Sequence, residues 1–222
     1  MPRRPLRDFA EFTGFLKERG LTPATVIDVG VCYGTPELQE GFPGAYHIRF
    51  EPLAELEPRM QALAARYGGE YHMVALGDRP GTLPLDVPEG ALQSATLARG
   101  DTGANTRMVP VQTLDGVLAG RDLARPVLLK TDAQGYDLNV MKGGLQVLAR
   151  TDVVVMEVNM FAPAGNRALG DFGTVVGWMQ AHGFAVYDIL SYQTRPLDGA
   201  LGYVDLAFVR ADGPLRADHR WQ

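Results

Sequence analysis

Two glycines four residues apart, directly after a run of apolar residues, are the clearest chemical signal in the sequence. The run is Val26–Val29, which contains Asp28, and the glycines are Gly30 and Gly34. A β-branched run predicts a buried strand, and glycine permits a tight turn and a close backbone approach that a Cβ would block. The threonine and proline that follow suit a helix start. A strand, a glycine loop and a helix start leave free N–H groups at the carboxyl end of the strand, where open α/β sheets bind nucleotide-like ligands.

The carboxylate of Glu51 follows the second predicted strand, where a nucleotide-binding site needs an acceptor for the ribose. Tyr46–Phe50 has apolar residues at alternate positions, which predicts a second strand, and Glu51 and Pro52 follow its end. A carboxylate at this place can accept hydrogen bonds from both ribose hydroxyls, and the alternative is a solvated carboxylate at a helix start. The glycine spacing is not the G-x-G-x-x-G of dinucleotide enzymes, so a nicotinamide-dependent oxidoreductase is the less favoured class.

Three further oxygen-bearing side chains stand at the ends of two later strands. Asp132 closes the run 126–132, and Glu157 and Asn159 stand at the end of the run that begins at Val153. The carboxyl ends of parallel strands meet at one edge of a sheet, so we expect these groups near the glycine loop. Asp132 is a candidate general base, with a structural cap of the next turn as the alternative. Together the three groups could hold a divalent cation through oxygen ligands.

Two other charged residues near this edge are weighed against structural roles. Asp137 falls in the first turn of a predicted helix, where the helix dipole alone explains a carboxylate. Lys130 lies in an apolar strand and needs a partner, and Asp132 two residues on would share its face of the sheet. The four histidines lack metal-ligand spacing.

Hydrophobic periodicity predicts the elements that position these residues. Strands alternate with helices and two strands close the chain, which predicts a three-layer αβα sandwich with a mostly parallel sheet. We expect helices over 6–19, 53–67, 113–118, 138–148 and 172–183, and strands over 26–29, 46–50, 71–76, 108–112, 126–132, 153–158, 184–190 and 203–210. The first helix is expected to pack on the sheet edge, with covering the ligand site as the alternative. The stretch 82–103 gives no clear pattern.

Composition is that of a soluble globular protein. The 222 residues suit a single domain over 1–222, with 1–22 as an N-terminal helical extension and 211–222 as a C-terminal tail. A net charge of −5 gives no excess of positive charge for binding nucleic acid. No apolar run reaches membrane-spanning length, and the N-terminus lacks a signal-peptide core. The single Cys32 excludes an internal disulfide, so we expect a cytoplasmic protein, either a monomer or a homo-oligomer.

Several short motifs occur in a recognisable order. They are Asp28-Val29-Gly30-x-x-x-Gly34, Phe50-Glu51-Pro52, Ala75-Leu76-Gly77-Asp78, Thr113-Leu114-Asp115, the block Leu129–Leu138 and the ending Val204–Arg210. In this order they resemble the FkbM-type methyltransferases over residues 9–210, most specifically in 128–144. The resemblance implies a Rossmann-like class I methyltransferase fold, with a seven-stranded, mostly parallel sheet and an antiparallel last strand.

The resemblance also implies S-adenosylmethionine as the cofactor and a hydroxyl of a sugar, glycan or natural product as the acceptor. Carried over position by position, the cofactor-binding residues are Asp28, Gly30, Tyr33, Gly34, Glu51, Pro52, Ala75, Leu76, Asp78 and Asp132. Asp132 would face the reaction centre, with Glu157 and Asp137 as further catalytic candidates. Two departures stand out, because Val31-Cys32-Tyr33 replaces small and polar residues in the glycine loop and Asp137 replaces a glutamate.

Methyl transfer from a sulfonium needs an aligned nucleophile and the exclusion of water. An aliphatic hydroxyl, with a pKa of roughly 15, must also lose its proton to a base or to a metal-bound group. We therefore expect an S-adenosylmethionine-dependent O-methyltransferase, with Asp132 as the base or with Mg²⁺ held by Asp132, Glu157 and Asn159. The alternatives are the oxidoreductase and a non-catalytic member that binds the cofactor without turnover.

Overall fold

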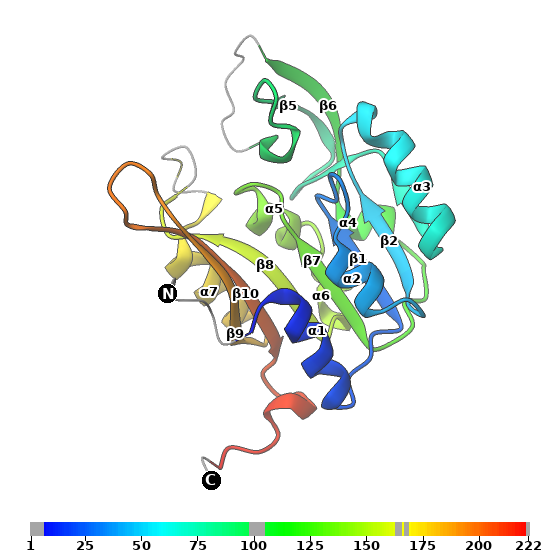
Figure 1. The fold of residues 1–222 in the computed structure, drawn as a ribbon, viewed down its shortest axis with the longest axis vertical. Coiled ribbons are helices and arrows are strands. Elements are labelled where there is room, and N and C mark those ends of the chain that lie inside the picture. Colours follow the sequence, from blue (N-terminus) through cyan, green and yellow to red (C-terminus); the bar gives the residue numbers. More distant parts are fainter. Residues whose placement is uncertain (1–6, 98–104, 163–165, 167–168, 221–222) are drawn as a thin grey trace.

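A seven-stranded sheet forms the centre of the molecule (Figure 1). The computed structural model describes residues 7–97, 105–162, 166 and 169–220. The strands follow the order β3 (Glu70–His72), β2 (Tyr46–Phe50), β1 (Thr25–Val29), β7 (Val127–Thr131), β8 (Val153–Asn159), β10 (Leu201–Arg210) and β9 (Phe184–Thr194). The neighbouring pairs from β3 to β8 are parallel, and the last strand, β10, is antiparallel to both β8 and β9. The predicted fold class is therefore confirmed.

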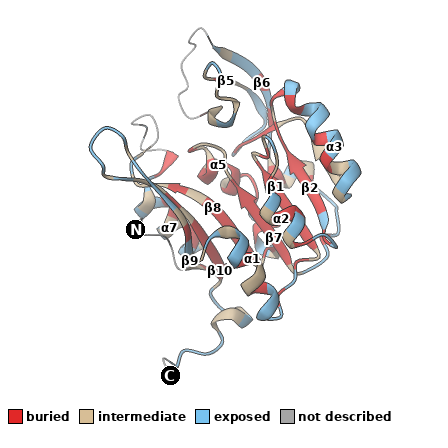
Figure 2. Ribbon diagram, viewed as in Figure 1, coloured by how far each residue is buried: buried red, intermediate tan, exposed pale blue. Residues whose placement is uncertain are grey.

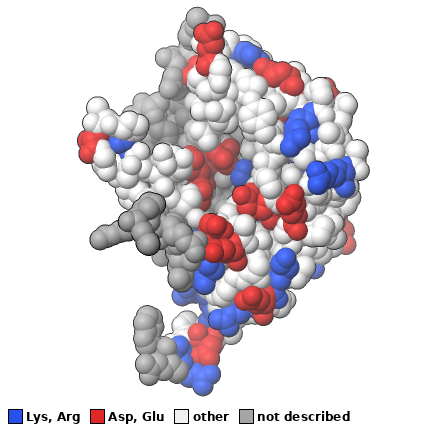
Figure 3. Space-filling view, viewed as in Figure 1, with Lys and Arg blue, Asp and Glu red and all other residues white. Residues whose placement is uncertain are grey.

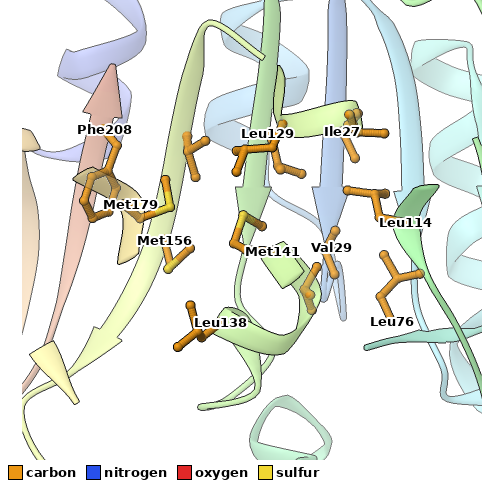
Figure 4. Close-up of a cluster of buried hydrophobic side chains, with 14 of the residues drawn as sticks. Ile27, Val29, Leu76, Leu114, Leu129, Leu138, Met141, Met156, Met179 and Phe208 are labelled. Carbon is orange, nitrogen blue, oxygen red and sulfur yellow. The ribbon is translucent and has the colours of Figure 1, made fainter. Parts of the chain in front are cut away.

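Helices cover both faces of this sheet. The first face carries α4 (Leu114–Val117), α5 (Asp137–Lys142), α6 (Leu145–Arg150) and α7 (Phe172–Ala181), whose apolar side chains join those of the central strands in the larger core (Figure 4). The opposite face carries α1 (Phe9–Glu18) and α2 (Pro36–Gly41), and α3 (Glu57–Tyr67) packs against β2 and β3. The sheet is buried throughout its centre, whereas the helices expose their outer sides (Figure 2). None of the described helices is long and apolar enough to cross a membrane.

The first helix lies over the middle of the sheet and not at its edge. Asp8 and Glu11 form a capping box, because each side chain accepts a hydrogen bond from the other's backbone N–H, and the helix therefore begins at Phe9. Phe12 and Leu16 are fully buried in a cluster with side chains of β1, β7, β8 and β10. This position differs from the predicted edge packing, and it brings the start of α1 to the carboxyl end of the sheet.

The predicted strand 71–76 is divided between two sheets. β3 ends at His72 in the central sheet, and β4 (Ala75–Leu76) begins a second sheet with the order β4, β6 (Thr106–Gln112) and β5 (Gly81–Asp86). β5 lies in the stretch that gave no pattern from sequence, where it pairs antiparallel with β6. The small sheet stands above the carboxyl ends of β1 and β2, and so forms an additional wall there (Figure 1).

The predicted helix 138–148 is two helices, α5 and α6, with Gly143 and Gly144 between them. A Cβ at Gly143 would lie 2.0 Å from the backbone oxygen of Gly77, so only glycine allows the corner to pack against the small sheet's connection. Gly143 itself has an ordinary φ of −81°. Glycine is therefore needed at position 143 because the backbone of Gly77 lies so close, and not because of an unusual backbone conformation.

Substitution of Gly143 by alanine should lower the free energy of unfolding by about 2 kcal/mol or more, because the added methyl overlaps backbone atoms. Gly177 in α7 provides the matched control, since a Cβ there meets nothing within 4 Å. Gly177→Ala should raise stability by roughly 0.5–1 kcal/mol through helix propensity. Chemical denaturation of both variants measures the difference. Equal effects of the two substitutions would contradict the packing argument.

Candidate functional site

A cavity of about 380 Å³ opens at the carboxyl ends of the central strands. Its walls come from four places in the chain: the glycine loop after β1, the turn after β2, the small sheet with the segment 92–97, and the loop after β7. We call 92–97 the wall segment. Glu37 of α2, Glu157 of β8 and Asp205 of β10 also line the cavity. Figure 3 shows the hollow on this face, with acidic side chains gathered at its edge.

The glycine loop is shaped by close packing against the loop after β7. Gly30 has φ +72°, and a Cβ there would lie 2.0 Å from the backbone oxygen of Asp132. Gly34 has φ +117°, which also excludes most side chains. Gly30, Gly34 and Tyr33 all line the cavity. Cys32 lines it too, with φ +46°, and burial raises the pKa of its thiol.

Glu51 ties the glycine loop to the turn after β2. One carboxylate oxygen accepts a hydrogen bond from the N–H of Cys32 at 2.8 Å, and the other accepts from the N–H of Leu53 at 3.0 Å. The residue is 3% exposed, and this burial raises its pKa above the ordinary value. It lines the cavity together with Pro52. Because a carboxylate has about four acceptor positions, roughly two remain for donors of a ligand.

An apolar slot lies beside Glu51. Ala75 and Leu76 of β4 line it, whereas Asp78 lies outside the residues that line the cavity. Sequence reasoning missed Leu85, Leu92, Ala95 and Leu97, which line it as well, together with Tyr136. These side chains come from the small sheet, the wall segment and the loop before α5, and they make a flat apolar group a suitable occupant.

Lys130 is a buried cation in the lining of this cavity. Its ammonium group donates a hydrogen bond to the carbonyl of Gly30 at 3.0 Å, and it lies 3.4 Å from Asp28 Oδ1 and 3.8 Å from Asp132 Oδ2. Burial alone would lower the pKa of Lys130, but the carboxylates of Asp28 and Asp132 outweigh it and the net shift is upward. Asp28 is 2% exposed and does not line the cavity, so it acts on the site through Lys130.

Asp132 lines the cavity where β7 ends. Its Oδ1 accepts a hydrogen bond from the side-chain amide of Gln134 at 2.7 Å, and its Oδ2 faces Lys130. The carboxylate is therefore oriented from both sides, and its side chain is still 37% exposed. This combination of fixed orientation and access suits a group that removes a proton from a bound molecule.

Asp137 has a structural position, in agreement with the alternative weighed for it. Its carboxylate is buried and accepts hydrogen bonds from the Thr131 hydroxyl at 2.7 Å and from the N–H groups of Ala133 and Gly135. Burial raises its pKa to about 6, with Asp132 as the next cause. It does not line the cavity, and its bonds fix the turn that carries Asp132 and Gln134.

Glu157 and Asp205 stand opposite each other on the neighbouring strands β8 and β10, and both line the cavity. Burial, reinforced by the charges of Asp132, Asp137 and Asp205, raises the pKa of Glu157 to about 9. Burial likewise raises the pKa of Asp205, whose Oδ2 accepts a hydrogen bond from Ser191 at 2.5 Å. Asp205 was missed at the sequence level, although a carboxylate inside an apolar strand was a signal.

The expected metal ligands do not converge on one point of the cavity. Asp132 and Glu157 line it, but Asn159 does not. Within 7–97, 105–162, 166 and 169–220, no group of three or more His, Cys, Asp or Glu residues is arranged to hold a metal ion. The residues present therefore lend no support to a magnesium site.

The raised pKa of Glu157 makes protein stability depend on pH. The folded state holds this proton up to about pH 9, whereas the unfolded state loses it near the ordinary value of 4.5. The free energy of unfolding should therefore fall as pH rises through this range. In Glu157→Gln, which cannot ionise, the fall should be smaller, while the exposed-site control Glu18→Gln keeps the original slope. Urea denaturation at pH 5, 7 and 9 compares them, and equal slopes for all three proteins would contradict the assignment.

The chain was compared with protein families, curated protein sequences and solved structures. The family model described as Methyltransferase FkbM domain matches residues 28–186. No curated protein sequence matches the chain significantly. Solved structures with a similar fold include magnesium protoporphyrin IX methyltransferase (ChlM) from Synechocystis PCC 6803 with bound SAM, at 10% identity and TM-score 0.49, over 91% of this chain and 77% of that one.

Two others are a putative RNA methyltransferase from Pyrococcus horikoshii and the bifunctional kinase-methyltransferase WbdD. The first has 16% identity and TM-score 0.45, over 91% of this chain and 82% of its own. The second has 14% identity and TM-score 0.46, over 91% of this chain and 37% of its own. The family model covers most of the chain, from the glycine loop through the carboxylates at the ends of β7 and β8 and into β9. The protein therefore belongs to the FkbM methyltransferase family.

Proposed function

We propose that this protein is an S-adenosylmethionine-dependent O-methyltransferase whose acceptor is a hydroxyl of a sugar, glycan or natural-product small molecule. Family membership supports methyl transfer. The observation that carries the choice of a hydroxyl is Asp132, an oriented and accessible carboxylate at the carboxyl end of β7. A hydroxyl, unlike a thiolate or a neutral amine, must lose its proton as it attacks, so it needs such a base.

The residues around the cavity fit the proposed cofactor. A Cβ at Gly30 would overlap the backbone oxygen of Asp132, so only glycine lets the glycine loop pack closely against the loop after β7 at the cavity. Glu51 keeps acceptor positions for the two ribose hydroxyls. The slot between Leu76, Leu97 and Tyr136 would take the flat adenine ring. Cavities of this size, with apolar walls and few polar groups, are typical of sites for such ligands.

In this proposal the chain's own residues orient the acceptor and remove its proton. S-adenosylmethionine, when bound, supplies a methyl group on a positively charged sulfur and leaves as the neutral thioether. Asp132 accepts the proton of the acceptor hydroxyl while the oxygen bonds to the methyl carbon. Gln134 and Lys130 hold the carboxylate for this step. The slot and the wall segment exclude water, which would otherwise compete as the acceptor.

The role of Glu51 in ribose binding can be tested by calorimetry. Wild-type protein should bind S-adenosylhomocysteine and should not bind NADH with comparable strength. Glu51→Gln replaces one acceptor oxygen by an amide, so affinity should fall by about tenfold or more, the scale of one charge-assisted hydrogen bond. Glu18→Gln, in the last turn of α1, is the control. Tighter binding of NADH would overturn the proposed function, and an unchanged affinity in Glu51→Gln would remove Glu51 from the ribose site.

The role of Asp132 can be tested on a panel of hydroxylated sugars and natural products with labelled S-adenosylmethionine. Asp132→Asn keeps the size of the side chain but cannot accept the proton. Turnover should fall by roughly a hundredfold or more, the scale of a lost general base, with affinity for S-adenosylhomocysteine little changed. Turnover should persist in EDTA, since the base needs no metal. Loss of activity in EDTA with recovery in Mg²⁺ would favour the metal route instead, and near-normal turnover of folded Asp132→Asn would refute the base.

A further inference from the structure

The carboxylate proposed as the base is connected to the wall of the cavity through a single residue. Gln134 donates its side-chain amide to Asp132 Oδ1 at 2.7 Å. The backbone carbonyl of the same residue accepts a hydrogen bond from the hydroxyl of Thr96 at 2.7 Å. Thr96 is buried in the wall segment, between the cavity-lining residues Ala95 and Leu97. Two hydrogen bonds therefore run from the wall segment to the carboxylate.

The backbone of Gln134 is held in an unfavourable conformation. Its φ is +50°, a region that L-residues other than glycine, asparagine and aspartate seldom occupy. Such conformations persist only where the surroundings impose them, and they concentrate at functional sites. Here the imposing contacts are the Thr96 hydroxyl on one side and the turn fixed by Asp137 on the other. The conformation directs the amide of Gln134 toward Asp132, where a glycine would leave the carboxylate without this donor.

We propose that Gln134 is a positioning residue that orients the Asp132 carboxylate, and that Thr96 couples this orientation to the wall segment. This inference rests on the proposed function, because it takes Asp132 as the group beside the transferred methyl. Lys130 contacts the other oxygen of Asp132 from below at 3.8 Å, so the shorter bond from Gln134 is the one that sets the direction of the carboxylate. A ligand that presses on the wall segment would thereby also align the base.

Two cofactor analogues can test this without an identified acceptor. S-adenosylhomocysteine has no charge at the transfer position, whereas sinefungin carries a protonated amine there. A correctly oriented Asp132 should favour sinefungin, so the ratio of the two dissociation constants reports on the orientation of the carboxylate. Calorimetry of wild type should show tighter binding of sinefungin. If neither analogue binds, the proposed function fails, and with it the basis of this inference.

Three variants separate positioning from folding. Gln134→Gly suits the positive φ but removes the side-chain amide. The preference for sinefungin should fall by roughly tenfold, which is the scale of one charge-assisted hydrogen bond. The affinity for S-adenosylhomocysteine should stay within about twofold of wild type. Thr96→Val should reduce the preference in the same direction, and Thr96→Ser, which keeps the hydroxyl, should restore it. Thermal melting confirms that each variant is folded. An unchanged ratio in Gln134→Gly, or an equal loss for both analogues, would overturn the proposal.

Discussion

The site depends on the contacts that the ammonium group of Lys130 makes with Asp28, Asp132 and the carbonyl of Gly30. Lys130 is buried in the lining of the cavity, in register with Asp28 on the adjacent strand, and it donates a hydrogen bond to the carbonyl of Gly30 as well. One cation therefore joins the end of β1, the glycine loop and the end of β7. A buried lysine is costly unless it is paired, and here the carboxylates of Asp28 and Asp132 provide the pairing. Removing Lys130 would leave the buried carboxylate of Asp28 without this cation.

Negative charge dominates the rest of the cavity. Glu157 and Asp205 face each other across two strands, and no lysine or arginine is paired with either of them among the ion pairs of the described residues. Burial is the main cause of the raised pKa of Glu157, and the charges of Asp132, Asp137 and Asp205 add to it. Glu157 therefore holds its proton more tightly than an ordinary carboxyl does, whereas Asp132, held by the Gln134 amide and facing Lys130, is the better candidate for accepting a proton.

The sequence predicted the parts of this molecule that depend on local pattern. The glycine loop, the strand ends at Glu51 and Asp132 and the partnering of Lys130 all followed from apolar runs and short spacings. The features that could not be predicted depend on contacts between segments that are far apart in the chain. Gly143 breaks a continuous helical pattern because the backbone of Gly77 lies against it, and that contact joins residues far apart in the chain. Asp205 reaches the cavity only because β10 pairs with β8, which no periodicity reveals. Thr96 and Gln134 meet for the same kind of reason.

The small sheet determines which part of the cavity lining can change independently of the central sheet. β4, β5 and β6 form a sheet separate from the central one, yet this unit and its wall segment provide one side of the cavity. Asp132, Lys130 and Glu51 lie on the central sheet and its loops, whereas the apolar lining that includes Leu76 and Leu97 comes from this unit and its wall segment. Changes within the unit would therefore alter the apolar lining of the cavity, and a change at Thr96 would also reach Gln134 through its hydrogen bond.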